Sequence, residues 1–141
     1  MAVTHLRNSR HAYPQSASGS EEDRCEEGRG CPNVFFTDRL TLLIQGYIVN
    51  DTWILEKLNL VPGKAVVKVP LSLLPELANT TPRYTDTGSI FFADQETIII
   101  QGDVVTDVEV LASLSIPSGE TVVEISLSLL PELEGDVAQY A

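Results

Sequence analysis

The chain has few of the residues on which most enzymes depend for catalysis. It contains two histidines and two cysteines, and all four (His5, His11, Cys25 and Cys31) lie before residue 32. General acid–base and nucleophilic catalysis need a base close to a nucleophile. The rest of the sequence holds neither a Ser-His-Asp set nor a glycine-rich phosphate loop. We therefore predict no catalytic residue and no cofactor.

The two cysteines are separated by five residues, a spacing that matches no common zinc motif, and no second pair is present. A redox pair or a pair of metal ligands is the functional interpretation of Cys25 and Cys31. Two incidental thiols in a flexible segment is the interpretation that we favour, so no metal site is expected.

Basic residues are also scarce, with nine Lys and Arg against 20 Asp and Glu and a net charge of −11. Duplex binding requires clustered cations that displace phosphate counterions, and anionic membranes select the same chemistry. We expect neither nucleic acid nor a membrane as partner. No run approaches the ~18 to 20 apolar residues of a membrane span, and no apolar run follows Arg7 and Arg10 as in a secretory signal. The cytoplasm is therefore the expected location.

The segment before the first apolar strand, residues 1–32, contains almost no bulky apolar side chain after Leu6 and is rich in Ser, Gly and Glu. Such a segment cannot bury enough apolar area to offset the entropy lost on ordering. We predict a disordered tail over residues 1–32, with a tether or partner-binding arm as the alternative.

From residue 33 onward the sequence contains an internal repeat. Residues 33–77 recur without a gap as residues 89–133, with 21 of the 45 columns identical. Leu71–Leu77 is repeated letter for letter as Leu127–Leu133. This pattern indicates a tandem duplication. Residues 78–88 are predicted to be a linker loop and residues 134–141 a frayed C-terminal end.

Each copy has the pattern strand, strand, short helix, strand. Residues 40–49 and 97–105 are rich in β-branched residues, and Ile98, Ile99 and Ile100 in succession predict a strand buried on both faces. Residues 67–73 and 123–129 alternate apolar and polar side chains, as in a half-buried strand. The predicted class is mainly β with two short helices (α+β), built from tandem ββαβ repeats.

One copy of the repeat is too small to be stable alone, because domains under roughly 60 residues bury little surface. We therefore expect the two copies to share one pseudo-two-fold barrel or sandwich core. Two separate small domains, or pairing between different chains, are the alternatives.

The stretches Leu58–Val67 and Leu114–Val123 resemble the helix, glycine turn and last strand of cradle-loop β-barrels, which include double-psi barrels and AbrB-type swapped-hairpin regulators. The resemblance is one of pattern and covers residues 41–69 and 97–125. It implies a six-stranded barrel closed by both copies. The DNA-binding members of this family use basic residues near the first hairpin, and this chain departs from that pattern with Gln45, Gln101, Asp51 and Asp107 at the matching positions.

Polar residues inside apolar strands are the first candidate contacts. Gln45 and Gln101 are each followed by a glycine, Gly46 or Gly102, which fits a bulge or a close backbone approach. A buried amide must find hydrogen-bond partners. We interpret the pair as satisfying backbone groups, with a symmetric ligand or partner contact as the alternative. Trp53 is interpreted as a core anchor, with an exposed contact residue as the alternative.

The two copies also differ in charge. Residues 33–77 carry four basic and four acidic side chains, whereas residues 89–133 carry eight acidic and no basic ones. Lys64 and Lys68 are replaced in the second copy by Glu120 and Glu124. A solubilising surface is one interpretation. The other is complementary contact, either of the lysine strand of one molecule with the glutamate strand of the next, or of a basic partner with the acidic copy.

These observations predict a non-catalytic interaction or assembly module that binds a protein partner or itself. An AbrB-like regulator or antitoxin is the second hypothesis. A small-ligand-binding barrel or enzyme with a site on the pseudo-axis is the third.

Overall fold

The computed structural model describes residues 2–8, 32–58, 62–85, 88–114, 116 and 119–138. Cys25 and Cys31 lie outside these residues, as does most of the predicted tail. The strands are β1 (Val3–Asn8), β2 (Asn33–Thr37), β3 (Thr41–Ile48), β4 (Lys64–Pro70), β5 (Arg83–Tyr84), β6 (Ser89–Phe92), β7 (Thr97–Val104) and β8 (Glu120–Ser126). The helices are α1 (Thr52–Leu58), α2 (Val108–Leu114) and α3 (Glu134–Ala138), with single 3-10 turns η4 (Leu71–Leu73), η5 (Pro75–Leu77), η6 (Leu127–Leu129) and η7 (Pro131–Leu133). The mainly β class with ββαβ units is confirmed.

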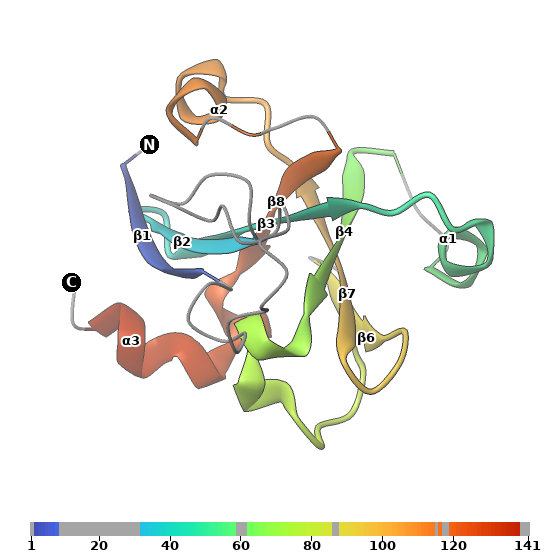
Figure 1. Cartoon of the computed structure of the whole chain (residues 1–141). Helices are drawn as coiled ribbons and strands as arrows, with labels where there is room; N and C mark the ends of the chain where they lie inside the picture. Colours follow the sequence, from blue (N-terminus) through green and yellow to red (C-terminus); the bar gives the residue numbers. More distant parts are fainter. Residues whose placement is uncertain are drawn as a thin grey trace, which may run out of the picture.

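The strands form two four-stranded antiparallel groups that exchange their last strands (Figure 1). In the first group β1, β2 and β3 of the first copy pair in order, and β8 of the second copy follows β3. In the other group β5, β6 and β7 of the second copy pair in order, and β4 of the first copy follows β7. Short β3–β4 and β7–β8 pairings close the ring.

Pairing between the copies is more extensive than pairing of β4 or β8 within its own copy. β3 and β8 are in register over seven residue pairs, from Thr41↔Ser126 to Tyr47↔Glu120, and β4 and β7 over another seven. The pairings β3–β4 and β7–β8 each comprise two pairs. Each copy therefore completes the sheet of the other.

A single core lies inside this ring and draws equally on both copies. All of its buried residues but Val137 form pairs at equivalent positions of the two copies. The pairs are Val34/Ile90, Leu42/Ile98, Ile44/Ile100, Val67/Val123, Val69/Ile125, Leu73/Leu129, Leu74/Leu130 and Leu77/Leu133. The expected joint pseudo-two-fold core is confirmed.

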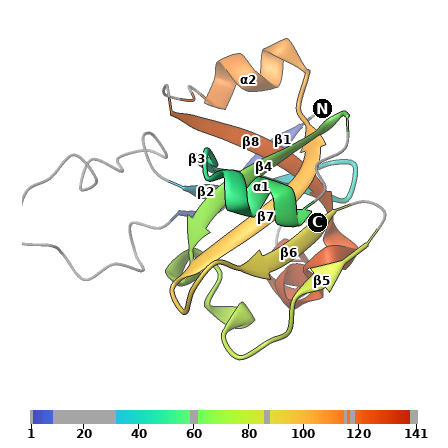
Figure 2. The same cartoon turned by 90° about the vertical axis from the view of Figure 1, so that its right-hand side faces the viewer.

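Two smaller clusters cover the outer faces of the sheets, and each again mixes the copies. Ile54 of α1 packs with Phe91 and Ile99 of the second copy, and Figure 2 shows α1 in front of this sheet. Val110 of α2 packs with Phe35 and Leu43 of the first copy. Middle residues of β3 and β7 are thus buried on both faces, as predicted.

Both predicted chain ends are corrected by the structure. Residues 3–8 form β1 instead of tail, because Val3 and Leu6 pack against two different apolar clusters. Residues 134–138 form α3 instead of a frayed end. Val137 lies one helical turn after Leu133 and is 5% exposed, so both side chains reach the same core. The predicted linker also contains the two-residue strand β5.

Candidate functional site

The two glutamines lie in separate hydrogen-bonded clusters. Gln45 is fully buried, and its Oε1 accepts a hydrogen bond from Asn33 Nδ2 at 3.1 Å while its Nε2 donates to Glu120 Oε1 at 2.9 Å. His5 Nε2 lies 2.9 Å from Asn33 Oδ1, so the chain of polar groups runs across β1, β2, β3 and β8. Burial raises the pKa of Glu120, and the hydrogen bond from Gln45 opposes that rise.

Gln101 has a shorter counterpart of this cluster, in which its Oε1 accepts a hydrogen bond from Ser89 Oγ at 3.1 Å. These hydrogen bonds join side chains on neighbouring strands, so each glutamine has side-chain partners in addition to any backbone group that it satisfies. Gln45 belongs to β3 and Gln101 to β7, in different four-stranded groups of the one sheet, and none of the hydrogen bonds given for the described residues joins their two clusters.

Gly46 in β3 and Gly102 in β7 lie at equivalent positions, where the neighbouring strand along one edge changes from one strand to another. β3 pairs with β2 up to Gln45 and with β4 from Tyr47. A Cβ on Gly46 would lie 2.6 Å from Val69 Cγ1 and 2.8 Å from the Lys68 carbonyl oxygen. The β3–β8 register is continuous here, so the close backbone approach is the correct interpretation.

The charged residues of β4 and β8 make their contacts within the chain. Lys64 Nζ lies 2.5 Å from Asp103 Oδ1, and Glu124 pairs with Arg39 at 2.7 Å. The Glu124 hydrogen bond raises the pKa of Arg39. β4 and β8 are also paired on both sides, with β7 and β3. Within the molecule Lys64 and Glu124 therefore pair with Asp103 and Arg39 rather than with each other, and both edges of β4 and β8 are occupied by neighbouring strands.

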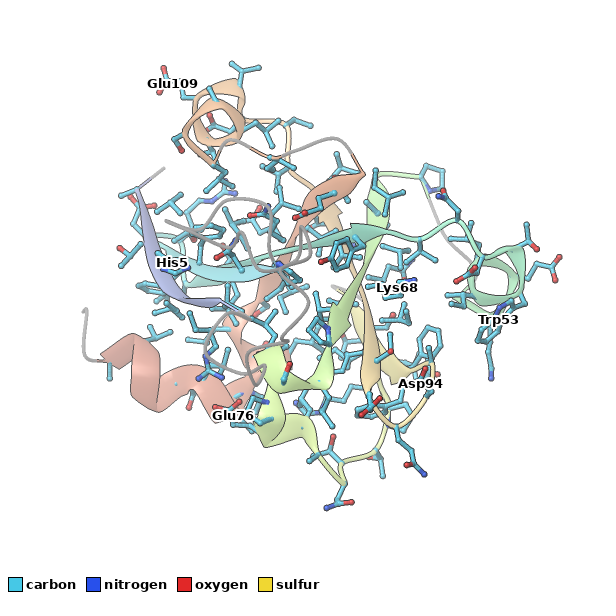
Figure 3. The ribbon with its side chains drawn as sticks, in the orientation of Figure 1. His5, Trp53, Lys68, Glu76, Asp94 and Glu109 are labelled. Atoms are coloured by element: carbon cyan, nitrogen blue, oxygen red, sulfur yellow. The ribbon has the colours of Figure 1, made fainter. Side chains whose placement is uncertain are left out.

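Trp53 is the one predicted contact residue that projects into solvent. Its side chain is 54% exposed and points away from the molecule (Figure 3). The core-anchor interpretation is wrong, because the buried face of α1 is formed by Ile54 and Leu55. Neighbouring helix positions point about 100° apart, so burying Ile54 turns Trp53 outward.

A groove on the surface is walled by both copies. One hollow of 610 Å³ includes Tyr47, Lys68, Pro70, Leu71, Pro75, Ala78 and Glu96 in its lining. A second, of 680 Å³, shares Leu71 and Ala78 with it and continues over Asn79, Thr80, Phe92, Asp94 and Gln95. The two hollows therefore lie next to each other, with Leu71 and Ala78 common to both, between η4–η5 of the first copy and the β6–β7 hairpin of the second; together they are called the groove.

The groove is lined by apolar and polar side chains in similar numbers, and most of the apolar ones belong to the first hollow. Ser72 is among the lining residues, and its Oγ is buried with no hydrogen-bond partner among the described residues. Hydrogen bonds from the Glu96 and Thr97 backbone and the Thr97 hydroxyl, with the nearby Lys68 ammonium, lower the pKa of Asp94. This combination is typical of a binding surface.

Sequence reasoning missed two arginines with equivalent roles. Arg7 of β1 donates through Nη1 and Nη2 to both Glu76 carboxylate oxygens at 2.9 Å and through Nη1 to the Leu73 carbonyl. Arg83 of β5 makes the same contacts with Glu132 and the Leu129 carbonyl. The hydrogen bond from Arg83 lowers the pKa of Glu132.

The repeated unit thus extends upstream of residues 33 and 89 and begins with an arginine-bearing strand. A gap-free comparison cannot find this strand, because the segment between β1 and β2 is much longer than the one between β5 and β6. The pair of arginines is the one sequence signal, since the residues next to them differ.

Within the described residues, no group of three or more His, Cys, Asp or Glu side chains is placed to hold a metal ion. No helix in that part of the chain combines the length and apolar character needed to span a bilayer. No family model matches the chain, and no curated protein and no solved structure matches it either. The function must therefore be argued from the surface itself.

Proposed function

We propose that this protein is a non-catalytic interaction module that holds a protein partner in the groove around Leu71 and Ala78. The observation that carries the proposal is that two adjacent hollows, which share Leu71 and Ala78, are lined by residues of both copies. The intertwined sheets keep both walls in place, so the surface is formed before the partner arrives. Such preorganisation lowers the entropic cost of association.

The groove fits binding better than chemistry. The first hollow is lined mainly by aliphatic, aromatic and proline side chains, and the second adds the polar side chains of Asn79, Thr80, Asp94 and Gln95. The lining side chains in this part of the chain include neither histidine nor cysteine. A protein surface of this kind accepts apolar anchors and orients them with a few polar contacts.

A pair of matched substitutions tests this proposal. Ala78→Tyr fills the junction of the two hollows without changing charge, and Ala78 is exposed, so the fold tolerates the larger side chain. Ala112→Tyr places the same side chain on the exposed face of α2, away from the groove. Tagged protein is incubated with an extract of its natural host, and bound proteins are identified by mass spectrometry.

We expect wild type and Ala112→Tyr to retain the same protein and Ala78→Tyr to lose it. Equal retention by all three proteins would exclude the groove as the contact surface. Thermal melting of each variant checks that the fold is intact.

A further inference from the structure

We propose that the segment held in the groove is an extended, basic stretch of the partner that carries aliphatic side chains. This inference rests on the proposed function and adds the chemistry of the occupant. It follows from the shape of the groove and from the charges that remain once the internal contacts of the chain are counted.

The shape favours an extended chain. The two hollows meet at Leu71 and Ala78, and the aromatic rings belong to different hollows, Tyr47 to the first and Phe92 to the second. A compact ligand fills one hollow and leaves the other open. An extended peptide contacts both, and its apolar side chains pack against the aliphatic and proline surfaces between them.

The charge of the groove is set by the second copy. Six of its eight acidic side chains have partners within the chain. Asp103, Glu124 and Glu132 are ion-paired, Glu120 bonds to Gln45, Asp94 bonds to its own turn, and Asp107 caps α2. In the described part of the chain Glu96 and Glu109 are the two of these acids with no side-chain partner.

Glu96 lines the groove, whereas Glu109 lies on α2. Figure 3 shows Glu109 at the opposite end of the molecule from Asp94, which is two residues from Glu96. The positive charge of Lys68 also lines the groove, but it acts on Asp94 and is one cause of the lowered pKa of that carboxyl. The uncompensated charge at this surface is therefore the negative charge of Glu96.

The charge of the whole chain acts in the same direction. A net charge of −11 attracts cationic segments and repels anionic ones. It also repels a second copy of the same chain and nucleic acid. A basic segment is thus favoured both by the local carboxylate and by the overall field, and its aliphatic side chains fit the apolar walls.

Defined peptides test the proposal on the full-length protein. The first probe is a fluorescent twelve-residue peptide of four Lys-Leu-Pro triplets, in which proline keeps the chain extended. Two matched probes replace every lysine with serine or with glutamate. Binding is measured by fluorescence anisotropy at three salt concentrations.

Four variants separate local contact from general attraction. Glu96→Lys and Glu96→Gln alter the groove carboxylate, whose side chain makes no hydrogen bond or ion pair with the described residues. Glu109→Lys changes the net charge of the chain by the same amount as Glu96→Lys. Ala78→Tyr blocks the groove. The melting temperature of each variant confirms that it is folded.

We expect the lysine probe to bind more tightly than the serine probe, and the glutamate probe not to bind. Glu96→Lys should lower the affinity for the lysine probe roughly three- to ten-fold. Glu96→Gln should lower it by about half as much on a logarithmic scale, and Glu109→Lys should have little effect. Ala78→Tyr should abolish binding, and added salt should weaken it.

The outcomes distinguish the two proposals. If the serine or glutamate probe binds best and Ala78→Tyr blocks it, the basic occupant is wrong and the groove function stands. If Glu96→Lys and Glu109→Lys weaken binding of the lysine probe equally and Ala78→Tyr leaves it unchanged, the attraction is general and the basic occupant is wrong, and the groove function is then decided by the capture experiment with Ala78→Tyr and Ala112→Tyr. If no probe binds at millimolar concentration, the basic occupant is wrong.

Discussion

Cutting the chain between the copies should leave neither half able to fold alone. A cut between residues 81 and 82 leaves η5 in the first half and β5 in the second. Each half contributes at least eight buried side chains to the shared core. Burial of one such side chain stabilises a fold by about 1.5 to 3 kcal/mol. If isolation exposes half of this surface, each half loses about 6 to 12 kcal/mol, which matches the whole stability of an ordinary domain of roughly 5 to 15 kcal/mol.

Mixed together, the halves should fold as a heterodimer. In the native register Lys64 faces Asp103. Pairing two second halves would place Glu120 opposite Asp103, where like charges repel. Pairing two first halves would place Lys68 at the position where Glu124 now binds Arg39, so two positive charges would face each other. The specificity for unlike halves therefore comes from these charges.

The assay is circular dichroism with thermal melting of residues 1–81, of residues 82–141 and of their equimolar mixture, with light scattering for mass. We expect a cooperative melt in the mixture alone, from a complex of 1:1 stoichiometry. A sharp melt from either half as a monomer would refute the shared core. A homodimer as stable as the mixture would refute the charge argument.

Three further predictions concern single residues. Gly46→Ala should lower the free energy of unfolding by about 1 to 3 kcal/mol, because the new Cβ would lie within 3 Å of the neighbouring strand. Gly135→Ala is the control, because nothing lies within 4 Å of the Cβ that it adds. If the two variants unfold at the same urea concentration, this account is contradicted. Burial raises the pKa of Glu120 in the folded state above its ordinary value of 4.5. The folded state therefore binds this proton more tightly than the unfolded state does, and the protein loses stability as the pH rises above 4.5. Glu120→Gln should therefore raise the melting temperature more at pH 7 than at pH 4, and a gain that is the same at both values would contradict the role of burial. Trp53 should be readily quenched by iodide in the native protein, because its side chain is 54% exposed, and complete protection from iodide would place this side chain in a contact that the structure does not show.

The class of fold and most of the core can be predicted from the sequence. The alternation along residues 67–73 and 123–129 identifies Val67, Val69, Val123 and Ile125 as inward-facing, and all four lie in the shared core. What periodicity cannot supply is the partner of each strand. Alternation indicates which side chains are buried. The same side chains are buried whether β4 and β8 pair within their own copy or with the other copy, so the exchange of these strands cannot be predicted from the alternation.

The candidate site is less accessible to sequence reasoning. The apolar strand around Gln45 indicates a buried amide, but its partners Asn33 and Glu120 are 12 and 75 residues away and become neighbours through strand register alone. The groove gives no sequence signal, since Leu71, Ala78 and Glu96 are ordinary residues that acquire meaning by lying together. The size and aromatic character of Trp53 favour a core position, whereas its place on α1 turns it outward.

The exchange of strands sets the order of events during synthesis on the ribosome. β3 is complete at Ile48, but the strand that covers its open edge ends at Ser126. At roughly 5 to 20 residues per second, translation of the intervening segment takes on the order of 4 to 16 s. During that interval the nascent first copy presents Leu43 and Ile44 without their final neighbours, so this apolar surface stays exposed for seconds before the second copy can cover it.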